Sequence, residues 1–163
     1  MALFKRNQIE EAISRAVVPT DGIPPGDLLN RLKRLLDTDR KLGRDPRSKD
    51  PEKSTYAFYS GSASGSGVEN WFQEYEAFAL LTALRFLEHG FPQQKSVSAL
   101  RAVRPDGAKT IKTLNICRGE FQMMNVIKAT LGPKTIFEIV NSVHQLHHYL
   151  SITEPSQRGR AAN

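Results

Sequence analysis

Apolar side chains recur at helical spacing most clearly in the segment from Trp71 to Pro105. In its first half they form two adjacent rows, which predicts a helix with a wide apolar face buried in the core. The first row contains Phe72, Tyr75, Phe78, Ala79, Thr82 and Phe86, and the second contains Leu80, Leu84 and Leu87. We therefore expect this helix to be the central element of the fold.

A glycine-centred turn is predicted to end this helix. Gly90 tolerates the left-handed backbone that terminates helices, and Phe91 behind it can fold back onto Phe86. Pro92 has the dihedral angle suited to the first turn of a second helix, which carries a narrower apolar stripe and ends at Pro105. The segment is thus predicted to be a helix, a tight turn and a second helix.

The N-terminal third predicts two more helices. Residues 4–18 place apolar side chains on one side and charged ones on the other, which indicates an amphipathic helix. Residues 19–26, PTDGIPPG, are rich in proline and glycine and are expected to form a loop. A second helix is predicted from Asp27, a capping or first-turn acid, to the residue before Gly43. Its buried side consists of Leu28, Leu32, Leu35, Leu36 and Leu42.

A change in composition follows this second helix. Residues 55–60 and 67–71 are β-prone and flank the sequence GSASGSG, which favours a β-hairpin with a long loop. The alternative is a single flexible Gly/Ser loop without strands, or a linker.

The C-terminal third is less regular. Residues 106–132 predict mixed short elements, and residues 133–150 show the spacing of a helix. Residues 153–163 are polar and are expected to be a disordered tail. We therefore divide the chain into an N-terminal unit at 1–105 and a C-terminal extension at 106–152.

Composition places the chain among ordinary globular proteins. Of its 163 residues, 39% are hydrophobic and 25% are charged, which is enough for one domain with a core. No apolar run reaches the roughly 18 residues of a membrane span, and the first residues lack the apolar core of a signal peptide. A single cysteine, Cys117, fits a reducing compartment. We expect a cytoplasmic protein without membrane contact.

The net charge of the chain and its distribution indicate the kind of molecule that the protein binds. The chain carries a net charge of +6, and residues 31–53 hold nine Lys or Arg against five acids, or +4 of that total. The region around the central helix is close to neutral. A local excess of cations favours a polyanionic partner such as nucleic acid.

Few residues of the sequence are candidates for catalytic groups or metal ligands. His144 and His148 lie one helical turn apart, but two histidines need a third ligand, so packing or surface histidines are the more common outcome. Nothing near Cys117 identifies a base, and GSASGSG lacks the lysine of a phosphate-binding loop. We expect no metal, no cofactor and no enzymatic activity.

The order of the predicted elements resembles the winged helix-turn-helix domain of MerR-type transcription regulators. The run from Tyr75 through LLTALRFLEHGFPQQKSVSALRAV looks like the family segment in which a helix ends in a Gly-Phe turn before a second helix packs back. The aromatic-flanked ribbon lies in the position of the family's wing. The resemblance covers residues 1–105, and it implies a mainly α fold with a winged unit, a small β-hairpin and a helical or mixed extension. The chain has no cysteine cluster for metal sensing, so no effector is implied.

The resemblance implies a function in DNA binding. The family's recognition helix corresponds to residues 27–42, which would read the major groove, while the 44–67 loop and hairpin would contact the backbone. A homodimer would match paired half-sites, with the 133–150 helix as the shared surface or, alternatively, as part of the monomer core. The implied DNA-binding residues are Arg31, Lys33, Arg34, Arg40, Lys41, Arg44, Arg47, Lys49, Lys53, Tyr56 and Tyr59.

Two alternatives remain open at this point. The cations of the 27–42 helix can simply solvate its outer side, with Asp37 and Asp39 as partners within the helix. The whole chain can also be a protein-interaction or adaptor module with no role in nucleic-acid binding. The sequence does not reveal an operator or the direction of regulation.

Overall fold

The computed structural model describes residues 3–18, 24–60, 70–102, 104 and 133–153. The predictions for residues 106–132, for GSASGSG and for the tail beyond residue 153 therefore lie outside the described residues. Within them the fold is mainly helical, as predicted. The helices are α1 (Arg6–Val17), α2 (Gly26–Leu42), α3 (Pro51–Ser54), α4 (Glu74–Glu88), α5 (Gln93–Ala102) and α7 (Pro133–Ile152). No described helix is both long enough and apolar enough to cross a membrane.

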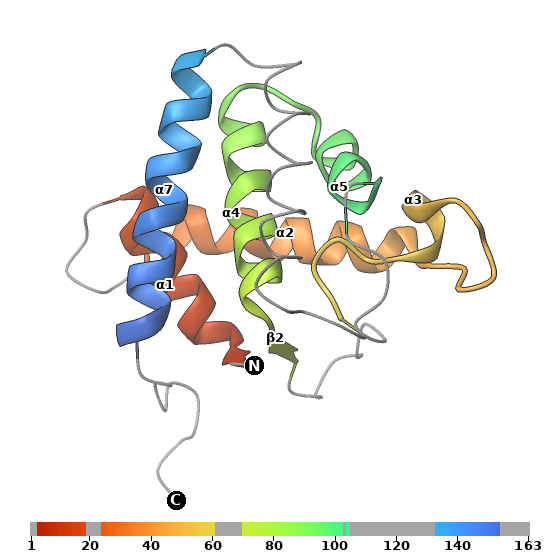
Figure 1. Cartoon of the computed structure of the whole chain (residues 1–163), viewed down its shortest axis with the longest axis horizontal. Helices are drawn as coiled ribbons and strands as arrows, with labels where there is room; N and C mark the ends of the chain where they lie inside the picture. The colour runs from red at the N-terminus through yellow and green to blue at the C-terminus, as the bar shows by residue number, and fades with distance from the viewer. Residues whose placement is uncertain (1–2, 19–23, 61–69, 103, 105–132, 154–163) are drawn as a thin grey trace, which may run out of the picture.

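Helix α4 is the central element of the fold. It lies between α7 and α5, and α2 crosses the molecule beside it (Figure 1). Every side chain from Tyr75 to Leu84 is buried, so α4 packs against neighbours on all sides rather than on one stripe. This burial confirms the wide apolar face that the two rows of apolar residues predict.

The turn between α4 and α5 has the predicted geometry. Gly90 has a φ of 82°, and the Phe91 amide donates to the Phe86 carbonyl oxygen at 3.0 Å. A second bond, from the Gly90 amide to the Leu87 carbonyl oxygen at 3.0 Å, completes a Schellman motif. The rings of Phe86 and Phe91 lie 5.5 Å apart between centroids. The turn thus sends α5 back towards α2.

Helix α7 packs against α1 and α4 and completes the core of the N-terminal unit. Leu146 and Leu150 are buried in the same cluster as the leucines of α2 and α4. The Gln8 side chain donates to the Thr153 carbonyl oxygen at 2.9 Å, which ties the end of α7 to the beginning of α1. Of the two roles that the sequence leaves open for this helix, its buried side takes part in the monomer core.

A two-stranded antiparallel sheet joins the N-terminus to the segment before α4. Strand β1 (Phe4–Lys5) pairs with β2 (Trp71–Phe72), and the register places Phe4 opposite Phe72. The helix expected at residues 4–18 therefore begins two residues later, after a short strand.

The predicted hairpin between residues 55–60 and 67–71 is wrong. Residues 55–60 form no strand, and β2 pairs with the N-terminus instead. The reason is that side chains satisfy the backbone of this segment. The carboxylate of Asp39 accepts the amides of Ala57 and Phe58 at 3.1 and 2.9 Å, so these amides are not available to a β-ladder.

Candidate nucleic-acid interface

Residues 43–54, which follow α2, form a closed projection that we call the basic arm. The Asp45 amide donates to the Lys53 carbonyl oxygen at 2.7 Å and joins the two ends of the arm. Asp50 directly precedes α3, and its carboxylate accepts the Glu52 amide at 3.1 Å. The arm extends beyond the end of α2 at one edge of the molecule (Figure 1).

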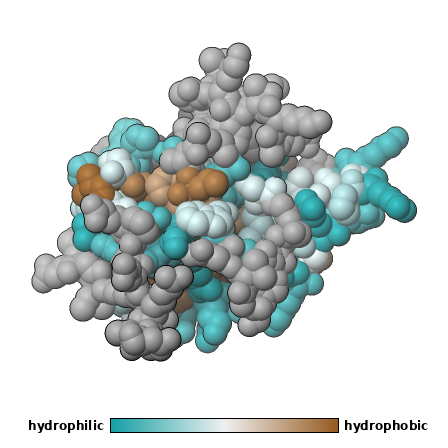
Figure 2. Space-filling model, turned by 90° about the horizontal axis from the view of Figure 1, so that it is seen from below, coloured by the Kyte–Doolittle hydropathy of each residue, from teal (hydrophilic) through white to brown (hydrophobic). Residues whose placement is uncertain are grey.

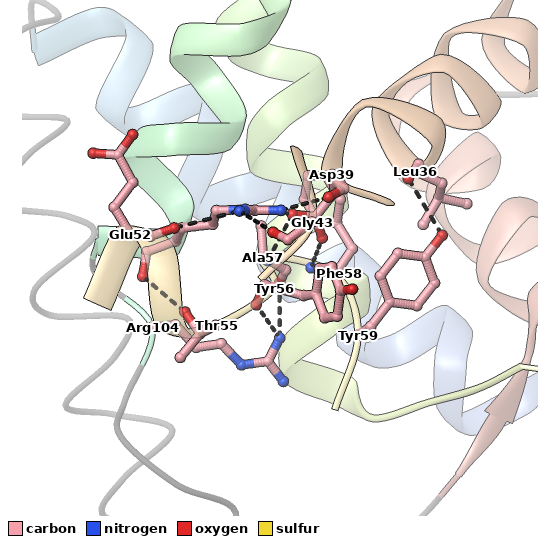
Figure 3. Close-up of polar contacts among 11 residues, drawn as sticks. Leu36, Asp39, Gly43, Glu52, Thr55, Tyr56, Ala57, Phe58, Tyr59 and Arg104 are labelled. Carbon is pink, nitrogen blue, oxygen red and sulfur yellow. Dashed lines mark hydrogen bonds and ion pairs between the residues drawn. The ribbon is translucent and has the colours of Figure 1, made fainter. Parts of the chain in front are cut away.

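Arg101 from α5 holds both ends of this arm against α2. Its Nε donates to Asp39 Oδ1 at 2.7 Å, and its Nη2 donates to the Asp39 carbonyl oxygen. Its Nη1 donates to the carbonyl oxygens of Gly43 and Glu52 at 2.7 and 3.3 Å (Figure 3). The side chains of Arg101 and Asp39 are 3% and 0% exposed, so this ion pair belongs to the core.

A second buried network lies beside the first. Arg104 donates to the carbonyl oxygens of Tyr56 and Ala57 at 2.7 and 3.1 Å (Figure 3). Its Nη2 also pairs with Glu76 Oε1 at 2.6 Å. Glu76 is fully buried and also accepts the Gln73 amide at 2.6 Å through Oε2. The segment that leads away from the arm is therefore fixed on its amide side by Asp39 and on its carbonyl side by Arg104.

All nine predicted basic residues of this region lie at the surface, on the outer side of α2 or on the arm. Arg40 pairs with Asp37 at 2.6 Å, and the guanidinium of Arg44 lies 5.5 Å from the centroid of the Tyr56 ring. Among the described residues, no carboxylate forms an ion pair with any of the other cations. The exposed set is Arg31, Lys33, Arg34, Arg40, Lys41, Arg44, Arg47, Lys49 and Lys53.

The buried ion pair changes the charge of this surface. Asp39 is neutralised in the core by Arg101, which lies outside the basic window of residues 31–53. The nine cations of the window are therefore opposed at the surface by four carboxylates, a net +5. The expectation that Asp39 pairs within its own helix is wrong, whereas Asp37 does pair with Arg40.

The two predicted DNA-contacting tyrosines are half-buried. Tyr59 donates its hydroxyl hydrogen to the Leu36 carbonyl oxygen at 3.4 Å, and its ring meets that of Tyr56 edge to face at 5.7 Å. Burial, with the nearby carboxylate of Asp39, raises the pKa of Tyr59 to about 12. The Tyr59 ring packs against the core, whereas the Tyr56 ring lies 5.4 Å from the guanidinium carbon of Arg101.

A shallow cleft of about 500 Å³ lies between the arm and α5. Its walls include the cations Arg44 and Lys53, the carboxylates Asp45 and Glu52, and the hydroxyl-bearing Ser98. Arg101 also lines the cleft, but its charge is paired with Asp39. The remaining lining cations and carboxylates are equal in number, so the cleft favours neither sign of ligand.

The histidines of α7 do not gather into a metal site in the described part of the chain. His144, His147 and His148 are exposed, and His147 Nδ1 contacts the Glu74 carboxylate. No group of three or more potential ligands occurs among the described residues.

Sequence reasoning missed the buried charges that position the arm. Asp39 follows Leu35 and Leu36 at helical spacing, so it falls on the leucine side of α2. A charged residue on an apolar stripe is the one signal that indicates a buried partner. Nothing in the sequence identifies that partner as Arg101, 62 residues further along the chain.

The chain was compared with models of known protein families, with curated proteins and with solved structures, and none of the three comparisons found a match.

Proposed function

We propose that this protein binds double-stranded DNA through a basic surface made of the outer side of α2 and the basic arm. The observation that carries the proposal is the local surface charge of +5, in which most cations have no carboxylate partner among the described residues. Cations that are free of partners can replace the counterions of a phosphate backbone, which is the main source of affinity for DNA.

The shape of this surface fits a duplex. Arg34 and Lys41 are separated by seven residues, or about two helical turns, so they lie on the same side of α2. The opposite side of the helix is buried through its leucines, so the basic side faces outward. A helix placed in this way can enter a major groove, and the cations of the arm beyond its end can meet the adjacent phosphates.

The proposal keeps the recognition helix implied by the MerR-type resemblance and changes the second contact. The wing of such a domain is a hairpin, whereas residues 55–60 form no strand here. The arm, with Arg44, Arg47, Lys49 and Lys53, takes over the backbone contact in our proposal. Sequence-specific binding as a transcription regulator requires base contacts from α2, for which Arg34 is the leading candidate.

A homodimer on paired half-sites is part of this proposal. The buried side of α7 is used within the monomer, so the dimer needs another surface. Exposed apolar side chains offer one, because Leu3, Trp71 and Ile152 are each about half exposed.

The proposal is tested by fluorescence anisotropy with a labelled duplex at several salt concentrations. Replacing Arg47 and Lys49 by glutamine removes two exposed cations from the arm. We expect weaker binding and a slope of log affinity against log salt that is shallower by up to about 1.8. The control is the pair Lys5→Gln and Arg6→Gln, which removes the same formal charge near β1, where Arg6 is already paired with Glu10. Equal effects of the two pairs, or no binding by the wild type at low salt, would refute the proposal.

A protein-interaction module is the second candidate, and the same apolar residues favour it. Figure 2 shows hydrophobic side chains gathered on the face seen from below, and the opposite end towards the arm is hydrophilic. Trp71 on β2 is 47% exposed and pairs in register with Lys5 of β1, the strand that directly follows the exposed Leu3. An apolar cluster at the surface is typical of a contact with another protein.

A further inference from the structure

We infer that Arg101 is a positioning residue that holds the basic arm closed for phosphate binding. The inference rests on the proposed function, because it concerns the same surface. Arg101 is 3% exposed, so it offers almost no surface that a DNA duplex could touch. Its effect on binding is therefore indirect and passes through the backbone of the arm.

The contacts of Arg101 bridge three parts of the chain. One nitrogen, Nη1, joins Gly43 at the beginning of the arm to Glu52 near its end. The remaining donors, Nε and Nη2, are both directed to Asp39 on α2. A single guanidinium thus fixes the two ends of the arm to each other and to the proposed recognition helix.

The side-chain type suits this role. A guanidinium is planar and presents five N–H donors in a fixed arrangement, whereas an ammonium is a compact group on a flexible stem. A lysine at position 101 would keep the charge that Asp39 requires. It could not hold the Gly43 and Glu52 carbonyl oxygens at the same time as both acceptors of Asp39.

A closed arm favours binding because its cations are already placed. If the arm were open, it would lose conformational freedom when it meets the duplex, and that loss would weaken the affinity. Arg44, Arg47, Lys49 and Lys53 all lie on the segment that Arg101 closes. Pinning the two ends therefore preorganises four of the nine cations.

The first test is hydrogen exchange at the Asp45 amide, which closes the arm through Lys53. In the wild-type protein without DNA we expect this amide to be protected. In Arg101→Lys we expect faster exchange there, while α4 amides keep their protection. Exchange at the unprotected rate in the wild type would overturn the inference, whether or not the protein binds DNA.

The second test is DNA affinity by anisotropy on the same two proteins. We expect Arg101→Lys to bind about tenfold more weakly although the net charge is unchanged. Leu146→Ala is the control, because Leu146 is a core residue of α7, away from the arm. It lowers stability without touching the arm and should retain wild-type affinity below its melting temperature. A loosened arm in Arg101→Lys with unchanged affinity would overturn the inference and leave the proposed DNA binding intact.

A third variant opens the arm without touching the core, in case Arg101→Lys does not fold. Asp50→Ala removes the carboxylate that accepts the Glu52 amide at the start of α3. If only charge mattered, Asp50→Ala should bind DNA more tightly, because it removes an acid from a basic surface. If the closed shape of the arm matters, the same variant should bind DNA more weakly. Weaker binding therefore supports the inference. The control Asp37→Ala removes an acid from α2 and should bind more tightly. Tighter binding by both variants would show that arm closure does not matter.

Discussion

Asp39 lies on the buried side of α2, where a carboxylate is costly unless its oxygens find donors. It meets this requirement with the Arg101 guanidinium and the amides of Ala57 and Phe58. One acidic side chain thereby fixes α5, the end of α2 and the segment after the arm. Its neighbour Asp37, two residues earlier, is 35% exposed, and within the described part of the chain its one ion pair is with Arg40.

These two aspartates should differ sharply in their contribution to stability. We expect Asp39→Ala to lower the free energy of unfolding by about 3–5 kcal/mol, because it leaves the Arg101 charge buried without a partner. Asp37→Ala breaks an exposed ion pair on the same helix and should cost about 0–1 kcal/mol. Chemical denaturation followed by circular dichroism measures both. Similar values for the two variants would show that Asp39 is not enclosed.

From the raised pKa of Tyr75 we predict that the folded protein loses stability in alkaline solution. Burial raises the pKa of this tyrosine to about 12, and its hydroxyl has no hydrogen-bond partner among the described residues. Since the folded protein holds this proton more tightly than the unfolded chain, the stabilisation is complete below pH about 10 and is lost as the pH rises towards about 12.

Tyr75→Phe tests the origin of this effect. We expect the variant to be at least as stable as the wild type at neutral pH, because it removes a buried hydroxyl that lacks a partner. Its alkaline transition should move to higher pH, as measured by circular dichroism during a base titration. Tyr59→Phe is the comparison, since the Tyr59 hydroxyl does donate to the Leu36 carbonyl oxygen. An unchanged alkaline transition in both variants would assign the effect to other groups.

At the scale of elements, local sequence rules describe the helices well. The α4 to α5 turn forms from Gly90, Phe91 and the apolar residues of α4, all close together in the chain. Helix α2 ends at Gly43, which has a φ of 63°, as its position after the last leucine indicates. Such signals act over a few residues and need no knowledge of distant partners.

Gly90 and Gly26 offer a matched test of this local control. A Cβ added at either position has no other atom within 4 Å, so crowding is absent in both cases. Gly90 has a φ of 82°, and we expect Gly90→Ala to destabilise the protein by about 1 kcal/mol. Gly26 is the first residue of α2, and Gly26→Ala should stabilise by about 0.4–1 kcal/mol. Thermal unfolding of the two variants should show shifts of opposite sign.

The β-hairpin is the element that local sequence patterns predicted wrongly. Residues 55–60 contain β-prone aromatics, and these signals favour a strand. Phe58 instead inserts fully into the core, while Asp39 and Arg104 take the hydrogen bonds that a strand partner would have supplied. The competing partners come from α2 and from just beyond α5, which no local window contains.

At the scale of the whole molecule, the basic arm and β2 lie at different parts of the surface (Figure 1). The basic arm lies at the right-hand edge of Figure 1 and α2 crosses the middle of the molecule, whereas β2 lies at the lower end. The separation of charge from apolar exposure is incomplete, since Leu42 at the end of α2 is 39% exposed. Trp71, on β2, is the only tryptophan of the chain. Its fluorescence therefore reports on one part of the surface alone.

This separation allows the two candidate functions to be distinguished in one experiment. We expect a saturating DNA duplex to leave the emission maximum of Trp71 unchanged, because the proposed contact lies elsewhere. A protein partner or a second copy covering β2 should shift the emission to shorter wavelength, since it removes a half-exposed indole from water. A blue shift on adding DNA would contradict the proposed position of the duplex.

The sequence by itself determined the five longer described helices to within a few residues of their ends, most of the apolar side of each, and the concentration of cations after residue 31. These features follow from the spacing of neighbouring residues and from composition, which act without tertiary contacts. The sequence did not indicate the short helix α3 or that Leu42, expected on the buried side of α2, is 39% exposed. Only the tertiary structure decided that Asp39 and Arg101 are buried together, that α7 completes the core, and that the N-terminus pairs with β2. Each of these joins residues far apart in the chain, and the partner of a buried charge or strand is set by packing rather than by any local pattern.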